Sequence, residues 1–261
     1  MKSIEAFMDY IKISINKTKE LKSLHSKKGR DKLRLFLAEG TKCISDLLGY
    51  FELSSLVCTP GWIEHHTRVQ EFSNKILIDT GGKAIRQISS LSTPPEAIAT
   101  FKIPESDVSI PQLKPDDLYV LLEDIQDPGN LGTIIRTCDW FGIYNIYASP
   151  ATVDVFNPKV VQATMGSLSR VKVMYLDLED LIKANRNVTL YGTLLMGTPL
   201  CEVNKNSGML LMGNEGKGIS ESLKKYIDTS VTIPPFNSKK HPDSLNVAIA
   251  SAIIISHFRN S

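Results

Sequence analysis

The sequence predicts an α/β protein of two domains, each built from alternating strands and helices. Short apolar runs that suit single buried strands alternate with amphipathic patterns of helical period along the whole chain. At 261 residues the chain is long enough to bury two hydrophobic cores. Three prolines among polar residues interrupt the pattern once, within residues 104–115. We therefore expect residues 106–116 to link a first domain, residues 1–105, to a second, residues 117–261.

The composition is that of an ordinary globular protein. Apolar residues make up 42% of the chain and charged residues 22%, and no apolar run approaches the roughly 18 residues of a membrane span. The N-terminal stretch carries acidic residues and lacks an apolar signal core, so we expect a cytoplasmic protein without a membrane partner. The four cysteines lie far apart, with no CxxC spacing and no paired histidines nearby. This spacing favours reduced thiols and predicts no metal site.

A net charge of +2 does not by itself indicate a nucleic-acid partner, but the basic residues are concentrated near the N-terminus. Nine Lys or Arg residues and only two acids lie between Lys12 and Arg34, on a short helical pattern and a following loop, Ser26–Lys32. Such density suits a polyphosphate backbone, whereas a solvated helix face is the other explanation. The residues expected to contact RNA or DNA are Lys17, Lys22, Lys27, Lys28, Arg30, Lys32 and Arg34.

The first domain is predicted to be a small sheet with helices on its faces. Its predicted strands are Leu35–Ala38, Leu53–Cys58, Lys75–Asp79 and Ala97–Ile103. Its predicted helices are a segment ending at Leu48, Trp62–Phe72 and Lys83–Leu91. We find no combination of nucleophile and base in this half of the sequence.

The second domain continues the alternation. Its predicted strands are Leu118–Leu122, Ile143–Ala148, Val171–Leu176, Val188–Leu195, Met209–Met212 and Ser230–Ile233. Its predicted helices begin near Thr133 and continue with Pro158–Leu168, Leu178–Ala184, Ser220–Tyr226 and Ser244–Phe258.

The first of three polar loops follows the strand Leu118–Leu122. Residues 127–130, Asp-Pro-Gly-Asn, predict a turn before the helix near Thr133. Backbone amides at a helix start favour a partly negative ligand group. Arg136 can reach back toward this loop, or it can be an ordinary surface arginine.

The second loop contains Gly213, Gly216 and Gly218 with Lys217 between the last two. Its spacing does not match a phosphate-binding loop or a dinucleotide fingerprint, and Glu215 would repel phosphate. Three close glycines still allow backbone to approach a bound small molecule.

The third loop precedes the final helix. Asp243 or Ser244 is a good N-cap for that helix, with Asn246 in its first turn. Polar loops that each follow a strand of one domain are expected to converge. The predicted site therefore combines Asn130 with Arg136, Asn214 with Glu215, and Ser244 with Asn246.

In sequence order, these loops resemble the three motifs of the SpoU, or TrmH-type, family of RNA ribose 2′-O-methyltransferases in the SPOUT superfamily. The first motif matches Asn130–Arg136 and the second matches Met212–Gly218. The third matches Ile233–Pro234 together with Ser244–Ala248, and all lie within residues 118–258. The first hundred residues resemble the family's RNA substrate-binding domain, a small fold akin to certain ribosomal proteins. That match lies in residues 16–17, 27–30 and 36–40.

The resemblance implies a parallel sheet whose C-terminal segment threads a loop and forms a deep trefoil knot. It implies S-adenosylmethionine bound in the knot, and a homodimer in which each active site borrows residues from both subunits. The implied cofactor-binding residues are Met212, Gly213, Gly218, Ile233 and Leu245. At position 213, we expect a side chain to occupy the space of the cofactor.

The resemblance also implies Arg136 as the residue that activates the ribose hydroxyl. A guanidinium stays protonated in proteins, so we expect it to stabilise the developing alkoxide and hold an RNA phosphate rather than act as a base. Asn130, Glu215, Ser244 and Asn246 are expected to position the reacting groups. The extended segment 235–243, with two lysines, departs from the family's shorter loop; these lysines are RNA contacts or part of a solvated loop.

The sequence therefore favours a ribose 2′-O-methyltransferase, with ribosomal RNA a better candidate than tRNA because a separate N-terminal domain is present. One alternative is a methyltransferase that acts on a base or on tRNA. Another is a non-catalytic RNA-binding or ribosome-assembly protein on the same fold.

Overall fold

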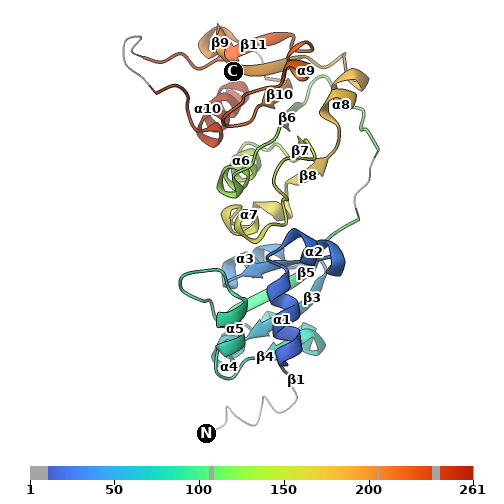
Figure 1. The fold of residues 1–261 in the computed structure, drawn as a ribbon, viewed down its shortest axis with the longest axis vertical. Helices are drawn as coiled ribbons and strands as arrows, with labels where there is room; N and C mark the ends of the chain where they lie inside the picture. The colour runs from blue at the N-terminus through green and yellow to red at the C-terminus, as the bar shows by residue number, and fades with distance from the viewer. Residues whose placement is uncertain (1–10, 106–108, 205, 237–241, 261) are drawn as a thin grey trace. The chain divides into compact units, whose positions relative to one another are not determined.

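The chain folds into two compact α/β units in a computed structural model that describes residues 11–105, 109–204, 206–236 and 242–260 (Figure 1). One unit comprises residues up to 105 together with residues 156–169, and the other comprises residues 106–155 and 170–261. The sequence placed residues 156–169 in the second domain. They belong to the first because the Phe156 ring lies 4.8 Å from that of Phe36, centroid to centroid.

The described strands of the first unit form a mixed sheet in the order β1-β4-β3-β5-β2 (Figure 1). β5 pairs antiparallel with β2 and β3, whereas β4 pairs parallel with β3 and β1. Every residue of β2 is buried, as expected for a sheet covered by helices. The strand bounds are β1 Ile11–Lys12, β2 Leu35–Glu39, β3 Leu53–Cys58, β4 Ile76–Ile78 and β5 Ala97–Lys102.

The helices of the first unit differ from the predicted ones at two places. The segment 26–32 was predicted as a loop, but Lys27–Leu33 form helix α2 and Ser26 is its N-cap, whose side chain accepts the Gly29 N–H at 3.1 Å. The predicted helix Trp62–Phe72 is instead α4 followed by a 3₁₀ helix, Thr67–Lys75. The helix bounds are α1 Ile15–Ser23, α2 Lys27–Leu33, α3 Thr41–Leu47, α4 Pro60–His65, α5 Lys83–Ile88 and α7 Pro158–Ala163.

The loop prediction failed because Gly29 argues against a helix on propensity alone. The structure requires a glycine there, since an added Cβ would lie 2.1 Å from Ser23 O. The C-terminal end of α1 therefore packs directly on the α2 backbone. A local sequence pattern does not show this contact.

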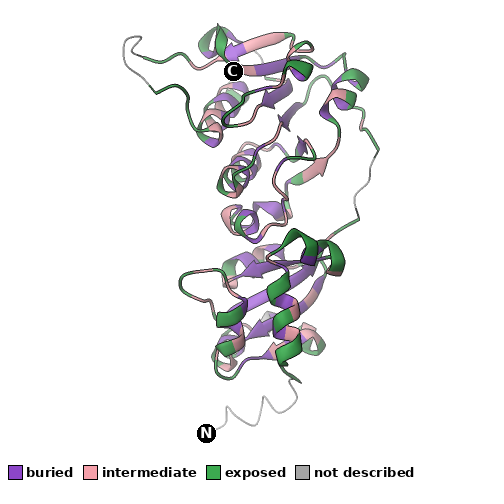
Figure 2. Ribbon diagram, in the orientation of Figure 1, coloured by how far each residue is buried: buried purple, intermediate pink, exposed green. Residues whose placement is uncertain are grey.

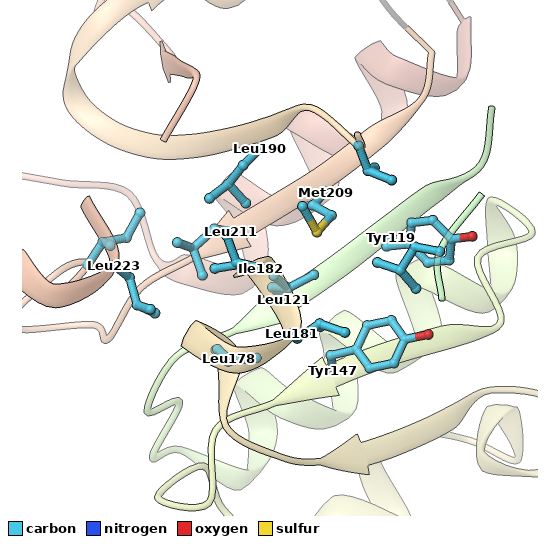
Figure 3. Close-up of a cluster of buried hydrophobic side chains, with 13 residues drawn as sticks. Tyr119, Leu121, Tyr147, Leu178, Leu181, Ile182, Leu190, Met209, Leu211 and Leu223 are labelled. Atoms are coloured by element: carbon cyan, nitrogen blue, oxygen red, sulfur yellow. The ribbon is translucent and has the colours of Figure 1, made fainter. Parts of the chain in front are cut away.

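The described strands of the second unit form the predicted parallel sheet, in the order β11-β9-β10-β6-β7-β8. A cluster of buried side chains from these strands packs against α8, with Leu121, Leu190 and Leu211 at its centre (Figure 3). The strand bounds are β6 Leu118–Leu122, β7 Asn145–Ala148, β8 Lys172–Tyr175, β9 Leu190–Pro199, β10 Gly208–Met212 and β11 Thr229–Thr232.

The helices of the second unit begin and end differently from the sequence prediction. The helix expected near Thr133 begins at Pro128, and the final helix begins at Val247 rather than Ser244. The helix expected to reach Leu168 ends at Ala163, within the segment that packs on the first unit's core. The helix bounds in the second unit are α6 Pro128–Trp140, α8 Leu178–Ala184, α9 Glu221–Lys224 and α10 Val247–Asn260.

The described part of the predicted linker is fixed to the second unit. Leu113 is buried in its core, and the Leu113 N–H donates to Asn185 Oδ1 at 2.7 Å. Asn185 Nδ2 donates in turn to Pro111 O at 3.0 Å. The stiff connection expected from the prolines is therefore also held by a buried amide.

All four cysteines are free thiols, as the sequence predicted. Burial raises the pKa of Cys43 and of Cys58 to about 12, and it also raises the pKa of Cys138. Such thiols stay protonated near neutral pH and make poor nucleophiles. In the part of the chain that the structure describes, no helix has the length and apolar character needed to cross a bilayer.

Arg30 is buried, contrary to its expected role in binding RNA. Only 2% of the residue is exposed, and Nη1 donates to Leu24 O at 2.9 Å and to His25 O at 3.2 Å. The guanidinium satisfies carbonyls at the turn between α1 and α2, so it leaves no surface for a phosphate. Exposed lysines lie on both helices, Lys19 and Lys22 on α1 and Lys27, Lys28 and Lys32 on α2. Both helices have exposed faces (Figure 2).

We predict that Arg30→Ala lowers the free energy of unfolding of the first unit by about 3 kcal/mol, because buried carbonyls are left without their donor. Urea unfolding would be followed by Trp62 fluorescence in a Trp140→Phe background, which leaves one tryptophan as reporter. The exposed Lys32→Ala on the same helix should change stability by less than about 0.5 kcal/mol. Equal effects of the two substitutions would contradict a structural role for Arg30.

Candidate active site

The parallel sheet brings the three polar loops to one edge. β6, β10 and β11 end at Leu122, Met212 and Thr232, and the carboxyl ends of parallel strands lie at a common edge. β6 and β10 are neighbours in a register that pairs Leu122 with Met212. The loops that follow them therefore leave the sheet side by side.

Two hydrogen bonds connect one residue from each loop. Asn130 Nδ2 donates to Glu215 Oε1 at 3.0 Å, and Asn246 Nδ2 donates to Asn130 Oδ1 at 2.9 Å. Asn130 uses its donor on one loop and its acceptor on the other. The convergence that the sequence predicted for these three residues is confirmed.

Glu215 also lies against the start of α6. Its carboxylate oxygens accept the backbone N–H groups of Gln126 and Asp127 at 3.4 Å each. Asp127 caps the helix, since its Oδ1 accepts the Asn130 N–H at 2.8 Å. Negative charge is favourable at a helix N-terminus, so the carboxylates of Glu215 and Asp127 both stabilise the start of α6.

Asn246, rather than Asp243 or Ser244, caps the final helix. Its Oδ1 accepts the N–H groups of Ala248 at 2.9 Å and Ile249 at 3.3 Å. The same side chain thus ends the third loop and bonds to the first. Ser244 is exposed and lies on the wall of a cavity.

Two backbone hydrogen bonds join the two ends of the glycine-rich turn after β10. Asn214 N–H donates to Gly218 O at 3.1 Å and Gly218 N–H donates to Asn214 O at 2.9 Å. An added Cβ at Gly213 would lie 2.4 Å from Gly218 C and 2.4 Å from Ile219 N. The reason expected for Gly213 therefore needs correction: this glycine lets the two sides of the turn approach, and the backbone is what a side chain would meet.

A cavity of about 590 Å³ opens beside these loops. Its volume lies within the range of about 300–1,000 Å³ typical of small-molecule sites. All five residues expected to bind the cofactor line it, together with Glu215 and Ser244. The five are Met212, Gly213, Gly218, Ile233 and Leu245.

Four further lining residues come from β9 and were missed by the sequence interpretation. They are Thr193, Leu194, Leu195 and Met196. Leu195 is 73% exposed and Met196 is 84% exposed, although both lie in a strand. The signal in the sequence was that the apolar run Leu194-Leu195-Met196 continues past the end of the predicted strand at Leu195.

Arg136 is exposed on α6 and does not line the cavity of its own chain. Among the described residues, none forms a hydrogen bond or ion pair with its guanidinium. Arg136 follows Asn130 by six residues, so the two side chains point about 120° apart around the helix axis. The structure thus brings together Asn130, Glu215 and Asn246, whereas Arg136 faces elsewhere.

Comparison with known proteins identifies the family. Residues 117–256 match the model of the SpoU rRNA Methylase family, and residues 16–99 match an MRM3-like substrate binding domain. The chain belongs to the SpoU family.

The similarity of this SpoU-family chain to individual proteins covers nearly its full length. A 23S rRNA (guanosine(2553)-2′-O)-methyltransferase, RlmP of Bacillus subtilis, is 31% identical over 93% of this chain and 96% of its own. The AdoMet-bound rRNA methyltransferase from Sinorhizobium meliloti is 30% identical, with a TM-score of 0.84, covering 97% of this chain and 98% of that one. A TrmH-family protein from Porphyromonas gingivalis is 33% identical, with a TM-score of 0.80, covering 95% and 98%.

One further residue, Asp124, holds the loops of the SpoU-family site in place, although it lies outside the matched motifs. Asp124 adopts a left-handed conformation, with φ of 56°, directly after β6. Its backbone oxygen accepts from Asn214 Nδ2 at 2.8 Å, and its Oδ1 accepts from Ser149 Oγ at 2.6 Å. Asp124 therefore connects the glycine-rich turn to the loop after β7.

Of the other basic residues expected to bind RNA, Lys22, Lys28, Lys32 and Arg34 are exposed. Lys17 is half-buried and pairs with Glu20 at 2.7 Å, and Lys27 pairs with Asp31 at 3.0 Å. Exposed pairs of this kind are weak, so they leave the lysines available to a phosphate. The two lysines of the extended third loop, Lys239 and Lys240, lie outside the described residues.

We predict that Gly213→Ala weakens S-adenosylmethionine binding about tenfold or more, because its Cβ forces the turn apart. Gly216→Ala is the matched control, since its Cβ would meet only Asn214 Oδ1, at 3.7 Å. Calorimetric titration of both variants gives the two dissociation constants. Equal affinities would show that the close approach at Gly213 does not shape the cavity.

Proposed function

We propose that this protein transfers a methyl group from S-adenosylmethionine to a ribose 2′-hydroxyl of ribosomal RNA. The observation that carries the proposal is the hydrogen-bonded contact of three family motifs, through Asn130, Glu215 and Asn246, beside a ligand-sized cavity. The relatives support the substrate class, because RlmP is named as a 23S rRNA 2′-O-methyltransferase. The Sinorhizobium meliloti structure supports the cofactor, because it contains AdoMet.

The residues of the cavity fit this cofactor. Apolar side chains such as Leu195, Ile233 and Leu245 suit the adenine face, and the backbone of the turn from Gly213 to Gly218 offers close polar contacts. Bound S-adenosylmethionine supplies an electrophilic methyl group on a sulfonium. The chain supplies alignment, since in-line transfer requires the ribose oxygen to be held opposite the sulfur.

Arg136 is proposed to act on the ribose oxygen electrostatically. Its guanidinium stays protonated and cannot remove the hydroxyl proton. A fixed positive charge stabilises the alkoxide character that develops as the proton leaves, and it holds the neighbouring phosphate through paired N–H donors. An oxygen of this phosphate would then accept the proton. Asn130, Glu215, Ser244 and Asn246 position the loops and the ribose.

A homodimer would bring Arg136 to a cavity. Arg136 does not line the cavity of its own chain, and apolar side chains are exposed on α6 and α10. Trp140 is 85% exposed, Ile249 is 53% exposed and Ile253 is 39% exposed. α6 and α10 pack against each other. We propose that a second copy covers them and that Arg136 then acts at the cavity of this partner. Membership of the family supports this arrangement and the trefoil knot.

The first unit is proposed to bind the RNA substrate in the cytoplasm. Its match to a substrate binding domain and its exposed lysines on α1 and α2 support this role. A separate binding unit favours a large structured target, so ribosomal RNA is preferred over tRNA. Methylation of a base or of tRNA, and RNA binding without catalysis, are the competing functions.

We predict that the wild-type protein with S-adenosylmethionine makes ribosomal RNA resistant to alkali at the modified linkage, because a 2′-O-methyl group removes the attacking hydroxyl. Arg136→Ala should lower the single-turnover rate at saturating RNA by about 10²- to 10³-fold, with cofactor affinity unchanged. Arg136→Lys keeps the charge without the paired donors and should retain part of the rate.

Nucleosides from the modified RNA separate the competing functions. Finding a methylated base in place of a 2′-O-methylated ribose would indicate that the protein is a base methyltransferase. A protein that binds RNA but not S-adenosylmethionine would be non-catalytic. A normal single-turnover rate for Arg136→Ala would remove the role proposed for this residue.

We also predict that replacing Lys27, Lys28 and Lys32 with Ala weakens RNA binding and flattens its dependence on salt. For every phosphate that a removed lysine had neutralised, the slope of log K against log[salt] should fall by about 0.7 to 0.9. Cofactor affinity should not change, because all three residues lie in the first unit. Filter binding at several salt concentrations measures the slope, and a parallel decrease in cofactor affinity would contradict the division between the units.

A further inference from the structure

The cavity wall carries four charged side chains, and two of them already have partners. They are Glu215, Lys217, Lys224 and Asp243. Glu215 takes part in the hydrogen bonds between the motif loops. Lys224 Nζ lies 2.6 Å from the carboxylate of Glu221, within the same short helix. Either side chain would therefore have to leave its present partner in order to bind a ligand.

Lys217 and Asp243 are the charges that remain. In the described portions of the chain, neither side chain forms an ion pair or a hydrogen bond, and no ion pair joins them to each other. The Lys217 N–H donates to Asn214 Oδ1 at 3.0 Å, so the backbone that carries this lysine is fixed at the cavity. Asp243 lies on the third loop, two residues before the cavity-lining Leu245. The wall thus presents one available cation and one available anion from different loops.

We propose that Lys217 binds the α-carboxylate of S-adenosylmethionine and that Asp243 binds its α-ammonium group. This inference rests on the proposed function, which supplies the cofactor. The methionyl end of the cofactor is a zwitterion, and each of its charges needs a partner where the cavity displaces water. The rest of the wall is mainly apolar or backbone, so these two side chains are the complementary pair.

An RNA phosphate is the competing ligand for Lys217. The neighbouring Glu215 and the Asp243 on the same wall carry negative charge and repel a phosphate. A zwitterion avoids that cost, because its ammonium group lies near the acids while its carboxylate contacts the lysine. The geometry therefore favours the cofactor over the RNA.

The test is calorimetric titration of the full chain, without RNA, by three ligands. S-adenosylmethionine has both charged groups, decarboxylated S-adenosylmethionine lacks the carboxylate, and 5′-methylthioadenosine lacks both groups. We expect the wild type to prefer S-adenosylmethionine over the decarboxylated ligand about fivefold, near the upper limit for an exposed ion pair. Lys217→Met should abolish most of this preference, and Lys217→Arg should keep it.

Two matched variants separate a direct contact from the general potential of the cavity. Lys224→Met removes the same charge from the same wall and should keep the preference for the carboxylate. Asp243→Asn should weaken both ligands that carry the ammonium group by a similar factor, so the preference stays unchanged. Binding of 5′-methylthioadenosine should be the same for all variants, which shows that the cavity is intact.

A preference that survives in Lys217→Met would overturn the assignment of the carboxylate. Weaker RNA binding by that variant, with the cofactor preference intact, would assign the lysine to a phosphate instead. Equal binding of S-adenosylmethionine by Asp243→Asn and wild type would overturn the assignment of the ammonium group. A wild type that binds none of the three ligands would overturn the proposed function itself, and with it this inference.

Discussion

The site depends on the hydrogen-bonded contact of Asn130 with Glu215 and Asn246. Each bond alone contributes only about 1 kcal/mol, but each connects loops that are far apart in sequence. Glu215 accepts from Asn130 Nδ2 and Asn246 donates to Asn130 Oδ1, so the amide of Asn130 has one orientation that satisfies both neighbours. The shape of the cavity wall follows from this orientation, because Glu215 and the residues next to Asn246 line it.

The order of the parallel strands explains why short side chains suffice for these contacts. β6 and β10 are adjacent, and β9 lies between β10 and β11. Loops after neighbouring parallel strands start only about 5 Å apart, which is within reach of an amide and a carboxylate. The position of β9 also explains its residues in the cavity wall. Its carboxyl end lies between the second and third loops, where Leu195 and Met196 face the open cavity.

The sequence predicted the alternating strands and helices and the converging loops because these depend on local patterns, whereas the parallel sheet and the cofactor residues were implied by the resemblance to a known family. Apolar runs predict buried strands, and strands of one parallel sheet end at a common edge. It did not predict features that depend on contacts between distant segments. In the sequence, the buried Arg30 cannot be distinguished from its exposed basic neighbours. The reason for glycine at position 213 is its close approach to Gly218, which only the structure shows. Residues 156–169 belong to the first unit because they pack on its aromatic core, which lies far away in the sequence. The start of α10 was misplaced because Asp243, Ser244 and Asn246 are all good caps, and only Asn246 accepts from the helix.

The separation of Arg136 from its own cavity has an electrostatic consequence. A sulfonium and a guanidinium repel each other, and the repulsion is strongest where water is excluded. An arginine on the cavity wall would therefore weaken cofactor binding before any RNA arrived. Arg136 instead faces away from the network that shapes its own cavity and has no partner among the described residues. In the proposed dimer, this guanidinium would lie beside the cavity of the other subunit, where the phosphates of the bound RNA would offset the repulsion between the two cations.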